Sequence, residues 1–335
     1  MRFLILLTII VTCCLSFVRW ENPVWKAPST FNAPFYKVEV SQLTRAKVEL
    51  GRKLFYDPIL SKNNTISCAS CHNSFHAFAH TDHALSHGIY DSIGTRNAPP
   101  LFNLAWSTHL MWDGASFHLD AQALAPIENN IEMDEKLNHV LIKLQQSQKY
   151  PALFKQAYGS PTITGERFLN ALQAFELTLV SASSKYDSVM ADQSSFTAQE
   201  KNGYQLFQKN CNRCHTEPLF TNHQFADNGL AVNPALNDVG RYRISRKSTD
   251  SLKFKVPSLR NLSYTYPYMH DGRFNSLQSV LKHYTKGIVQ HPNLDEGLRA
   301  GIPLSDKERT DIIAFILTLN DRSFVFNKNY SEPKN

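Results

Sequence analysis

Two short motifs combine a pair of cysteines with an adjacent histidine. Cys68-Ala69-Ser70-Cys71-His72 and Cys211-Asn212-Arg213-Cys214-His215 share the spacing C-x-x-C-H. Two cysteines three positions apart can each add to one vinyl group of a haem, and the next histidine can then bind its iron. A zinc or disulfide pair is the alternative, but it does not explain why the motif occurs twice after similar helices. The sequence therefore predicts two covalently bound haem c groups, with His72 and His215 as iron ligands.

The composition is that of an ordinary globular protein. Of its 335 residues, 42% are hydrophobic and 19% are charged, and the formal net charge is +6. This length predicts two domains. Because the lysines and arginines are scattered rather than collected into a run that could follow phosphates, nucleic-acid binding is disfavoured.

The first 20 residues are typical of an export signal. Arg2 precedes an apolar run from Phe3 to Val18, which is too short to span a membrane, and no later segment reaches the roughly 18 apolar residues that a span needs. Cys13 and Cys14 leave a lipoprotein cleavage site as an alternative, with a lipid anchor on the mature protein. We therefore expect a periplasmic protein, free or tethered, whose other four cysteines serve the haems.

The apolar periodicity is helical almost throughout, and strand-like alternation is scarce. One helix is predicted to begin at Thr197 in a capping box with Glu200 and to run into Cys211. The other predicted helices cover residues 41–56, 135–147, 165–182 and 276–285, and the stretch from the Ser305/Glu308 capping box to Leu319. The fold class predicted is mainly α.

The two halves of the chain repeat one another. Each haem motif follows a Gly-x-x-Leu-Phe helix, at Gly51–Phe55 and at Gly203–Phe207. Downstream, Arg96-Asn97 leads to Asp113-Gly114, and Arg260-Asn261 leads to Asp271-Gly272. We interpret this as internal duplication of one cytochrome c-like haem domain. The predicted domains are residues 21–185 and 186–335, divided where polar sequence near 180–195 interrupts the periodicity.

Further motifs connect these features to a known family. They are Gly51-Arg-Lys-Leu-Phe55, Arg96-Asn-Ala-Pro99, Trp112-Asp-Gly114, Ile131-Glu-Met133, Val256-Pro-Ser-Leu-Arg-Asn261 and Tyr266-Pro-Tyr-Met-His-Asp-Gly272. With these and both haem motifs, the chain resembles the bacterial di-haem cytochrome c peroxidases, including their MauG branch, over roughly residues 41–321. The resemblance implies that the first-domain haem is the peroxide site and that the second-domain haem stores or passes electrons.

The resemblance also implies roles for three residues near the first haem. Glu132 matches the acid that moves a proton between the oxygens of peroxide. From its sequence alone it would be a solvated residue at a helix start. Gln122 matches a second polar residue of the active site. Trp112 matches a tryptophan between the two haems, where an indole can assist electron transfer, and the alternative is a buried aromatic residue.

A calcium ion at the domain interface is a further implication of the resemblance. Asn97, Thr265 and Pro267 match the residues that contact it in relatives, partly through backbone carbonyls, and calcium prefers such hard oxygen ligands. Without the resemblance, Asn97 before Ala-Pro would be interpreted as part of a turn.

The sequence departs from the peroxidase pattern at the far side of each haem. Ile89 occupies the place of a histidine that caps the first haem in many relatives, so we expect this haem to be open or weakly capped. His76, His80, His83 and His87 lie nearby, and His87 is the alternative cap.

At the second haem, Tyr284 takes the place of the peroxidase methionine, as a tyrosine does in MauG. A phenolate ligand favours ferric iron and lowers the reduction potential. The alternative ligands are Met269 and His283.

Three functions are compatible with these residues. The leading hypothesis is a peroxidase that reduces hydrogen peroxide with electrons from a small donor such as a c-type cytochrome or cupredoxin. The second is a MauG-like oxidase that uses peroxide to oxidise a protein or small molecule. The third is a di-haem electron carrier without catalysis, which would leave Glu132 idle. A homodimer is an open alternative to a monomer.

Overall fold

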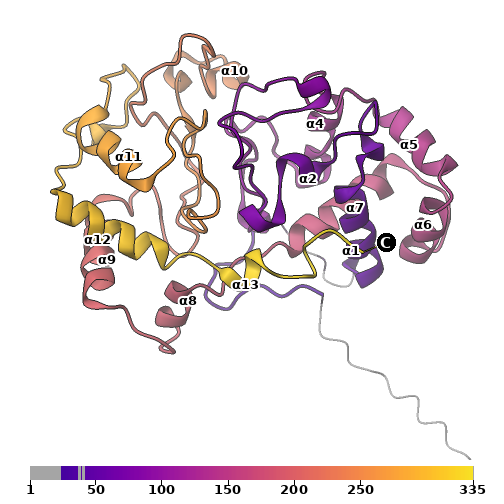
Figure 1. The fold of residues 1–335 in the computed structure, drawn as a ribbon, viewed down its shortest axis with the longest axis horizontal. Helices are drawn as coiled ribbons and strands as arrows, with labels where there is room; N and C mark the ends of the chain where they lie inside the picture. The colour runs from indigo at the N-terminus through magenta and orange to yellow at the C-terminus, as the bar shows by residue number, and fades with distance from the viewer. Residues whose placement is uncertain (1–23, 37–38, 40–41, 335) are drawn as a thin grey trace, which may run out of the picture.

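The computed structural model describes residues 24–36, 39 and 42–334 and consists of two helical lobes that lie side by side (Figure 1). The predicted export signal at residues 1–20, with Cys13 and Cys14, lies outside the described residues. Of the described helices, none is long and apolar enough to cross a membrane.

The first lobe is built around two crossing helices, α1 (Arg45–Tyr56) and α7 (Gly165–Thr178). The remaining helices of this lobe are α2 (Cys68–Cys71), α3 (Leu119–Gln122), α4 (Leu124–Glu128), α5 (Leu137–Gln146) and α6 (Tyr150–Tyr158). Phe55, Phe78 and Phe175 are fully buried between these helices and pack edge to face. Long loops between α2 and α3 carry His72, Asn97 and Trp112 of the predicted site residues.

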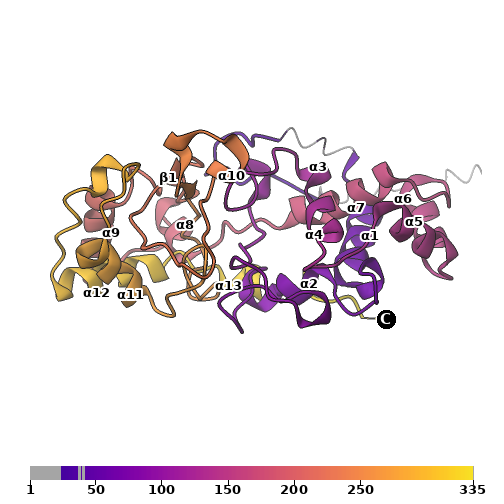
Figure 2. The same cartoon turned by 90° about the horizontal axis from the view of Figure 1, so that it is seen from above.

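The second lobe repeats this plan with α9 (Ala198–Asn210) crossing α12 (Asp306–Leu317). Its other elements are α8 (Lys185–Met190), α10 (Tyr242–Ser245), α11 (Leu277–Lys282) and a short antiparallel pair of strands, β1 (Phe225–Ala226) and β2 (Phe254–Lys255). In the strand pair Phe225 is opposite Lys255. Viewed from above, the lobes remain separate, with α9, α11 and α12 at one end and α1, α5 and α6 at the other (Figure 2).

A glycine at each helix crossing explains the repeated Gly-x-x-Leu-Phe motif. A Cβ atom on Gly51 would overlap the carbonyl of Ala171, and one on Gly203 would overlap the carbonyl of Asp311. Only glycine allows the two helices to approach so closely. The same crossing in both lobes agrees with two cytochrome c-like units in a mainly helical fold.

Local capping signals place several helix ends where the sequence predicts them. Both capping boxes are present, Thr197 with Glu200 and Ser305 with Glu308. The helix predicted at 41–56 begins later, at Arg45, because the Thr44 side chain caps it. The helix predicted at 165–182 ends at Thr178, and α11 ends at Lys282, where a π-turn over His283–Gly287 takes over.

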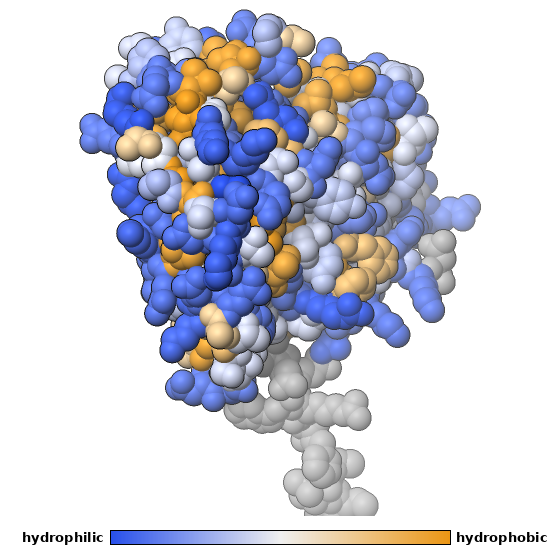
Figure 3. All heavy atoms as spheres, turned by 60° about the vertical axis from the view of Figure 1, so that its left-hand side comes forward, coloured by the Kyte–Doolittle hydropathy of each residue, from blue (hydrophilic) through white to orange (hydrophobic). Residues whose placement is uncertain are grey.

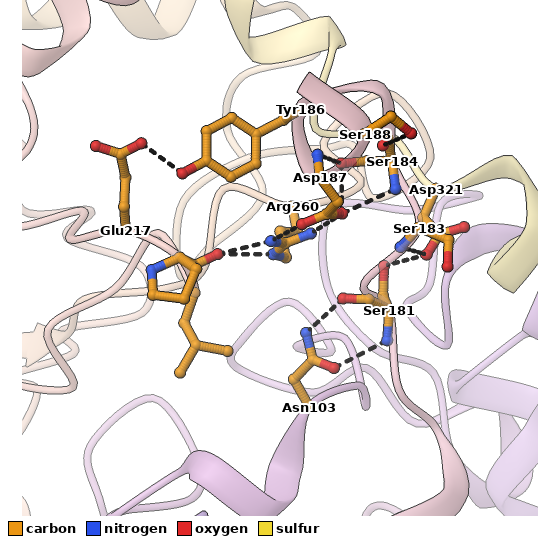
Figure 4. A network of polar contacts seen from close by, with 12 residues as sticks. Asn103, Ser181, Ser183, Ser184, Tyr186, Asp187, Ser188, Glu217, Arg260 and Asp321 are labelled. Carbon is orange, nitrogen blue, oxygen red and sulfur yellow. Dashed lines mark hydrogen bonds and ion pairs between the residues drawn. The ribbon is translucent and has the colours of Figure 1, made fainter. Parts of the chain in front are cut away.

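A buried polar network holds the connection between the lobes (Figure 4). The Arg260 guanidinium, with no exposed side-chain surface, donates to both carboxylate oxygens of Asp187 at 2.7 and 2.8 Å and to the carbonyl of Pro218. Arg260 thus joins the start of α8 to the loop that follows the second haem motif. Beside it, Ser181 is linked both to Asn103 of the first lobe and to Asp321.

The C-terminal segment returns from the second lobe to the first. After α12 the chain forms α13 (Arg322–Val325) and ends next to α1 (Figure 1). Phe324 and Val325 are buried in the core of the first lobe. Tyr330 donates to the carbonyl of Thr178 in α7, and Arg52 of α1 donates to the carbonyls of Lys328 and Ser331.

Candidate functional site

The two motif histidines have the same surroundings in the two lobes. His72 Nδ1 donates to the carbonyl of Phe78 at 2.9 Å, and His215 Nδ1 donates to the carbonyls of Phe220 and Pro257 at 3.2 and 3.1 Å. Because a carbonyl can only accept, Nδ1 carries the proton and Nε2 is left with a free lone pair. Burial lowers the pKa of each imidazole to about 4. Both histidines are therefore neutral and suited to bind iron through Nε2.

The four motif cysteines are free thiols. Burial raises the pKa of Cys68 and of Cys211 to about 12, and that of Cys71 to about 11. Among the described residues no cluster of three or more histidine, cysteine or acidic side chains is placed to hold a bare metal ion, so the zinc alternative has no support there. Neutral buried thiols beside a neutral imidazole fit covalent haem attachment with one axial histidine.

Glu132 lies close to the first haem motif. Its charge acts on the Cys71 thiol, and Asn129 donates to its Oε1 at 2.6 Å. Glu132 is not at the start of a helix but in the turn after α4, so the alternative of a solvated helix start is wrong. Burial raises the pKa of Glu132, and the Asn129 hydrogen bond partly offsets this. The sequence analysis did not single out Asn129, although its spacing of three residues from Glu132 could have suggested it.

The loop around Ile89 packs directly against Glu132. Ile89 is fully buried, and its N–H donates to the carbonyl of Glu132 at 2.7 Å. The rings of His83 and His87 stack with centroids 4.2 Å apart, and His87 Nδ1 lies 3.0 Å from an Asp91 carboxylate oxygen. One ring nitrogen of His87, the alternative ligand that could cap the first haem, is thus already in contact with Asp91.

Gln122 contacts a residue of its own lobe, whereas Trp112 contacts the second lobe. Gln122 Nε2 donates to the sulfur of Met111 at 3.7 Å. Trp112 Nε1 donates to the carbonyl of Asn97 at 2.8 Å, and its own carbonyl accepts from Lys255 of strand β2 at 2.7 Å. Trp112 therefore contacts strand β2 of the second lobe, and its place between two haems stays a prediction.

In the second lobe one asparagine reaches both candidate ligands of the iron. Asn228 Nδ2 lies 3.5 Å from the Tyr284 hydroxyl and 3.6 Å from the Met269 sulfur. Tyr284 is close enough to the second haem motif for the charges of Cys211 and Cys214 to act on it. His283 points elsewhere, because its Nε2 donates to the carbonyl of Asn228 at 3.0 Å. Tyr284 and Met269 thus remain the two ligand candidates.

The residues predicted to hold calcium belong to two segments that meet between the lobes. The N–H of Asn97 donates to the carbonyl of His270 at 2.7 Å, and its side-chain amide donates to the carbonyl of Ala84 at 3.1 Å. Thr265 is buried in the segment that leads to His270. The structure therefore brings Asn97 next to the segment that contains Thr265 and Pro267.

Two half-buried basic side chains of the second lobe, His223 and Lys255, are missing from the site residues predicted from the sequence. His223 has no hydrogen-bond partner at either ring nitrogen among the described residues, and burial, followed by the charge of Lys255, lowers its pKa to about 4. Burial lowers the pKa of Lys255 to about 8. No local pattern connects them, because His223 and Lys255 are far apart in sequence.

Comparison with known proteins agrees with this geometry. The family model described as di-haem cytochrome c peroxidase matches residues 45–195, and the model described as cytochrome c matches residues 200–320. The methylamine utilization protein MauG of Methylorubrum extorquens is 38% identical over 293 residues, which cover 84% of this chain and 80% of that protein. The chain belongs to the di-haem cytochrome c peroxidase family, which includes MauG and binds two haem c groups.

Other relatives support the same assignment. The cytochrome c551 peroxidase of Nitrosomonas europaea is 34% identical over 298 residues, covering 86% of this chain and 84% of that protein. Among solved structures, a MauG-like protein associated with microbial copper homeostasis has a TM-score of 0.80 at 29% identity and covers 92% of this chain and 99% of its own. The predicted family and fold class are thereby confirmed.

Proposed function

We propose that this chain is a periplasmic di-haem peroxidase that reduces hydrogen peroxide to two molecules of water with two electrons and two protons. The observation that carries the proposal is Glu132, a half-buried carboxyl next to the first haem motif and oriented by Asn129. The second lobe has a different arrangement, in which Tyr284 and Met269 are candidate iron ligands. We therefore assign the acid–base chemistry to the first site, through Glu132.

Glu132 performs the proton transfer in this proposal. When bound through His72, the first haem would supply the redox chemistry that breaks the O–O bond of peroxide. The Glu132 carboxylate would take a proton from one oxygen of peroxide and give it to the other, which leaves as water. Burial raises the pKa of Glu132, which favours its protonated form compared with an exposed glutamate. Asn129 keeps Oε1 in place during the transfer.

Replacing Glu132 with Gln tests the proposal. Both haems should be retained, and peroxide cleavage should slow by about 10²- to 10⁴-fold in stopped-flow mixing, the range expected for a lost acid–base group. Glu128→Gln is the matched control, because Glu128 is a nearby exposed carboxyl paired with Lys136. An unchanged rate in the Glu132 variant would remove the proton-transfer role.

A second candidate function is peroxide-driven oxidation of a protein or small molecule, as the MauG branch suggests. The observation that favours it is Tyr284, whose hydroxyl lies beside Asn228 near the second haem motif. A phenolate ligand would stabilise oxidised iron and let the ferric protein react with peroxide without prior reduction. Tyr284→Phe should then change the low-spin electron-resonance signal while Met269→Leu leaves it unchanged. The opposite pattern supports a methionine-ligated peroxidase.

Electrons enter, in this proposal, through a groove of about 390 Å³ on the second lobe. The apolar residues Leu230 and Phe274 line this groove. Its lining also includes three cations, Arg273, Lys282 and Lys286, and no acidic residue. On the face shown in Figure 3, apolar patches are small and interrupted by hydrophilic residues. His283, which also lines the groove, bonds to Asn228 and so connects it with Tyr284. A small redox protein with an acidic face fits this surface.

We also propose a calcium ion between the lobes, held in part by Asn97, Thr265 and the Pro267 carbonyl. An ion that binds only the docked form would stabilise it by mass action. Treatment with a chelator should lower the melting temperature, and metal analysis of the purified protein should find calcium. If neither result is obtained, these residues are a structural turn.

A further inference from the structure

One buried carboxyl of the first lobe has no role in the chemistry above. Glu176 lies near the end of α7 and is only 5% exposed. Its Oε2 has no hydrogen-bond partner among the described residues. A buried, unpaired carboxyl destabilises a fold unless it stays neutral, so its presence calls for a function.

The second lobe shows that the fold itself does not need an acid at this position. Helix α7 corresponds to α12, because Gly51 meets Phe175 as Gly203 meets Phe315. Thr178 and Thr318 each donate to the carbonyl three residues earlier, at 2.6 Å in both lobes. In this register Glu176 corresponds to Ile316, which is 6% exposed. An aliphatic side chain thus fills the same place at the second haem domain.

Glu176 also lies close to the first haem attachment site. Burial is the main cause of the raised pKa of Cys68, and the negative charge of Glu176 is the next. The corresponding thiol, Cys211, owes its raised pKa to burial and to Cys214, with no carboxylate among the causes. The two haem domains therefore differ by one carboxyl at the attachment cysteine.

We propose that Glu176 takes up one proton when the first haem site gains one electron and releases it when that electron leaves. The proton comes from and returns to solvent, so the net charge of the buried pocket stays constant during the change. The inference rests on the proposed function for its part in turnover, because peroxide reduction needs protons as well as electrons. In this proposal Glu176 changes the reduction potential of the first haem and takes no direct part in the chemistry of peroxide.

The surroundings of Glu176 leave few competing groups. Burial raises the pKa of Glu176 to about 8, which allows proton exchange near neutral pH. On α1, Lys47 contacts Tyr158, Glu49 pairs with Arg52, Arg52 also contacts the C-terminal segment, Arg45 is exposed and Lys53 is half-buried. On α3 Asp120 is exposed, and on α5 both His139 and Lys143 contact Glu135. Tyr330 bonds to the Thr178 carbonyl. Cys68 ceases to titrate once it is attached to haem.

Potentiometric titration of the intact di-haem protein at a series of pH values tests the proposal. In the wild type, the potential of the first haem should fall as pH rises, by up to about 59 mV per unit for one proton per electron. Glu176→Gln should flatten this slope. Because the variant lacks the negative charge, its potential should exceed the wild-type value at high pH and equal it at low pH.

Two controls keep the test decisive. Glu176→Ile copies the side chain of the second lobe and should also flatten the slope, and the second haem should titrate identically in all variants. Redox-induced infrared difference spectra of the wild type should contain a carboxyl signal that Glu176→Gln removes. Equal slopes for the first haem in wild type and both variants would overturn the proposal. Because the titration needs no peroxide, failure of the peroxidase proposal would be seen separately, as absence of turnover.

Discussion

Asn129 partly offsets the effect of burial on the pKa of Glu132 through one hydrogen bond. Its amide donates to the Glu132 carboxylate at 2.6 Å and so stabilises the charged form, against the burial that raises the pKa of Glu132. The two effects oppose each other at the carboxyl that we propose moves protons in the first site. Replacing Asn129 therefore tests the pKa of Glu132 without removing the carboxyl group.

We predict that Asn129→Ala raises the pKa of Glu132 further. Since the carboxylate form must accept the first proton, the acid limb of the rate of peroxide cleavage should move to higher pH, while the maximal rate at alkaline pH changes little. The measurement is a stopped-flow pH profile. Asn130→Ala, an exposed neighbour, should leave the profile unchanged. A profile that shifts equally in both variants would contradict the role of the hydrogen bond.

Glu176 makes a separate prediction for stability. Burial raises its pKa from 4.5 to about 8, so the folded protein binds this proton more tightly than the unfolded chain does. The tighter proton binding by Glu176 contributes fully to the free energy of unfolding below pH 4.5. This contribution decreases as pH rises from 4.5 to about 8, and it amounts to about 1.4 kcal/mol for each unit by which the pKa is raised. Denaturant unfolding should show wild type losing stability relative to Glu176→Gln over this interval. A constant difference would show that Glu176 stays charged.

At the level of elements, each lobe depends on one glycine at a helix crossing. A methyl group on Gly203 would overlap the backbone of α12, which would force α9 and α12 apart. We expect Gly203→Ala to lower the free energy of unfolding of the second lobe by about 1–3 kcal/mol, the usual cost of overpacking. We also expect less haem to be incorporated in that lobe. Gly165→Ala is the control, because only the flexible end of Leu137 lies near its added methyl. Haem staining and thermal unfolding would measure both.

Features decided by neighbouring residues could be predicted from the sequence. The capping boxes at Thr197 and Ser305 form as expected, because their partners are three residues away. The haem motifs are likewise local, and so is the glycine pattern. Helix ends without such signals were misplaced, as at Thr178, where the sequence remains apolar beyond the last turn.

The parts that could not be predicted depend on contacts between distant residues. Asn228 meets both Met269 and Tyr284, and Lys255 lies beside Trp112, through loops that have no periodic pattern. Resemblance to the family, rather than local physics, pointed to Glu132, because one acid among several in that stretch is not distinguished by its sequence. Burial of Glu176 was missed since a single acid in an apolar helix could face either way.

At the scale of the whole molecule, the lobes are joined by a charged pair as well as by the linker. Arg96 donates to both Asp238 oxygens at 2.6 and 2.8 Å and to Asp113 at 2.7 Å. Burial alone would raise the pKa of Asp238, but the hydrogen bond and charge of Arg96 hold it below its usual value. This contribution to stability is therefore present at neutral pH and is lost as pH falls through the lowered pKa.

We predict that Asp238→Asn weakens lobe docking by about 3–5 kcal/mol, because Arg96 then keeps a buried charge with only one partner. The variant should also lack the part of the acid sensitivity that Asp238 contributes. Calorimetry at several pH values would measure both effects. Asp250→Asn serves as control, since its contact with Arg241 is long, at 3.8 Å. Equal melting behaviour of the two variants would show that the pair is dispensable.

Charge on the second lobe should control the delivery of electrons. Lys282→Glu with Lys286→Glu should lower the rate with an acidic donor by about 10-fold or more at low salt, because steering is lost. Added salt should shrink the difference. Lys155→Glu on α6, in the first lobe, changes the net charge at a distant place and should have little effect. If all variants respond alike, donor binding takes place elsewhere.

The return of the chain from α12 to α1 affects the order in which the protein can mature. Phe324, Val325 and Tyr330 complete the core of the first lobe, yet they follow the entire second lobe in sequence. A chain that emerges from its N-terminus reaches them last. We therefore expect the core of the first lobe to close at α1 and α7 only after this later segment has packed against them. Attachment of haem at Cys68 and Cys71 is then expected to precede that closure.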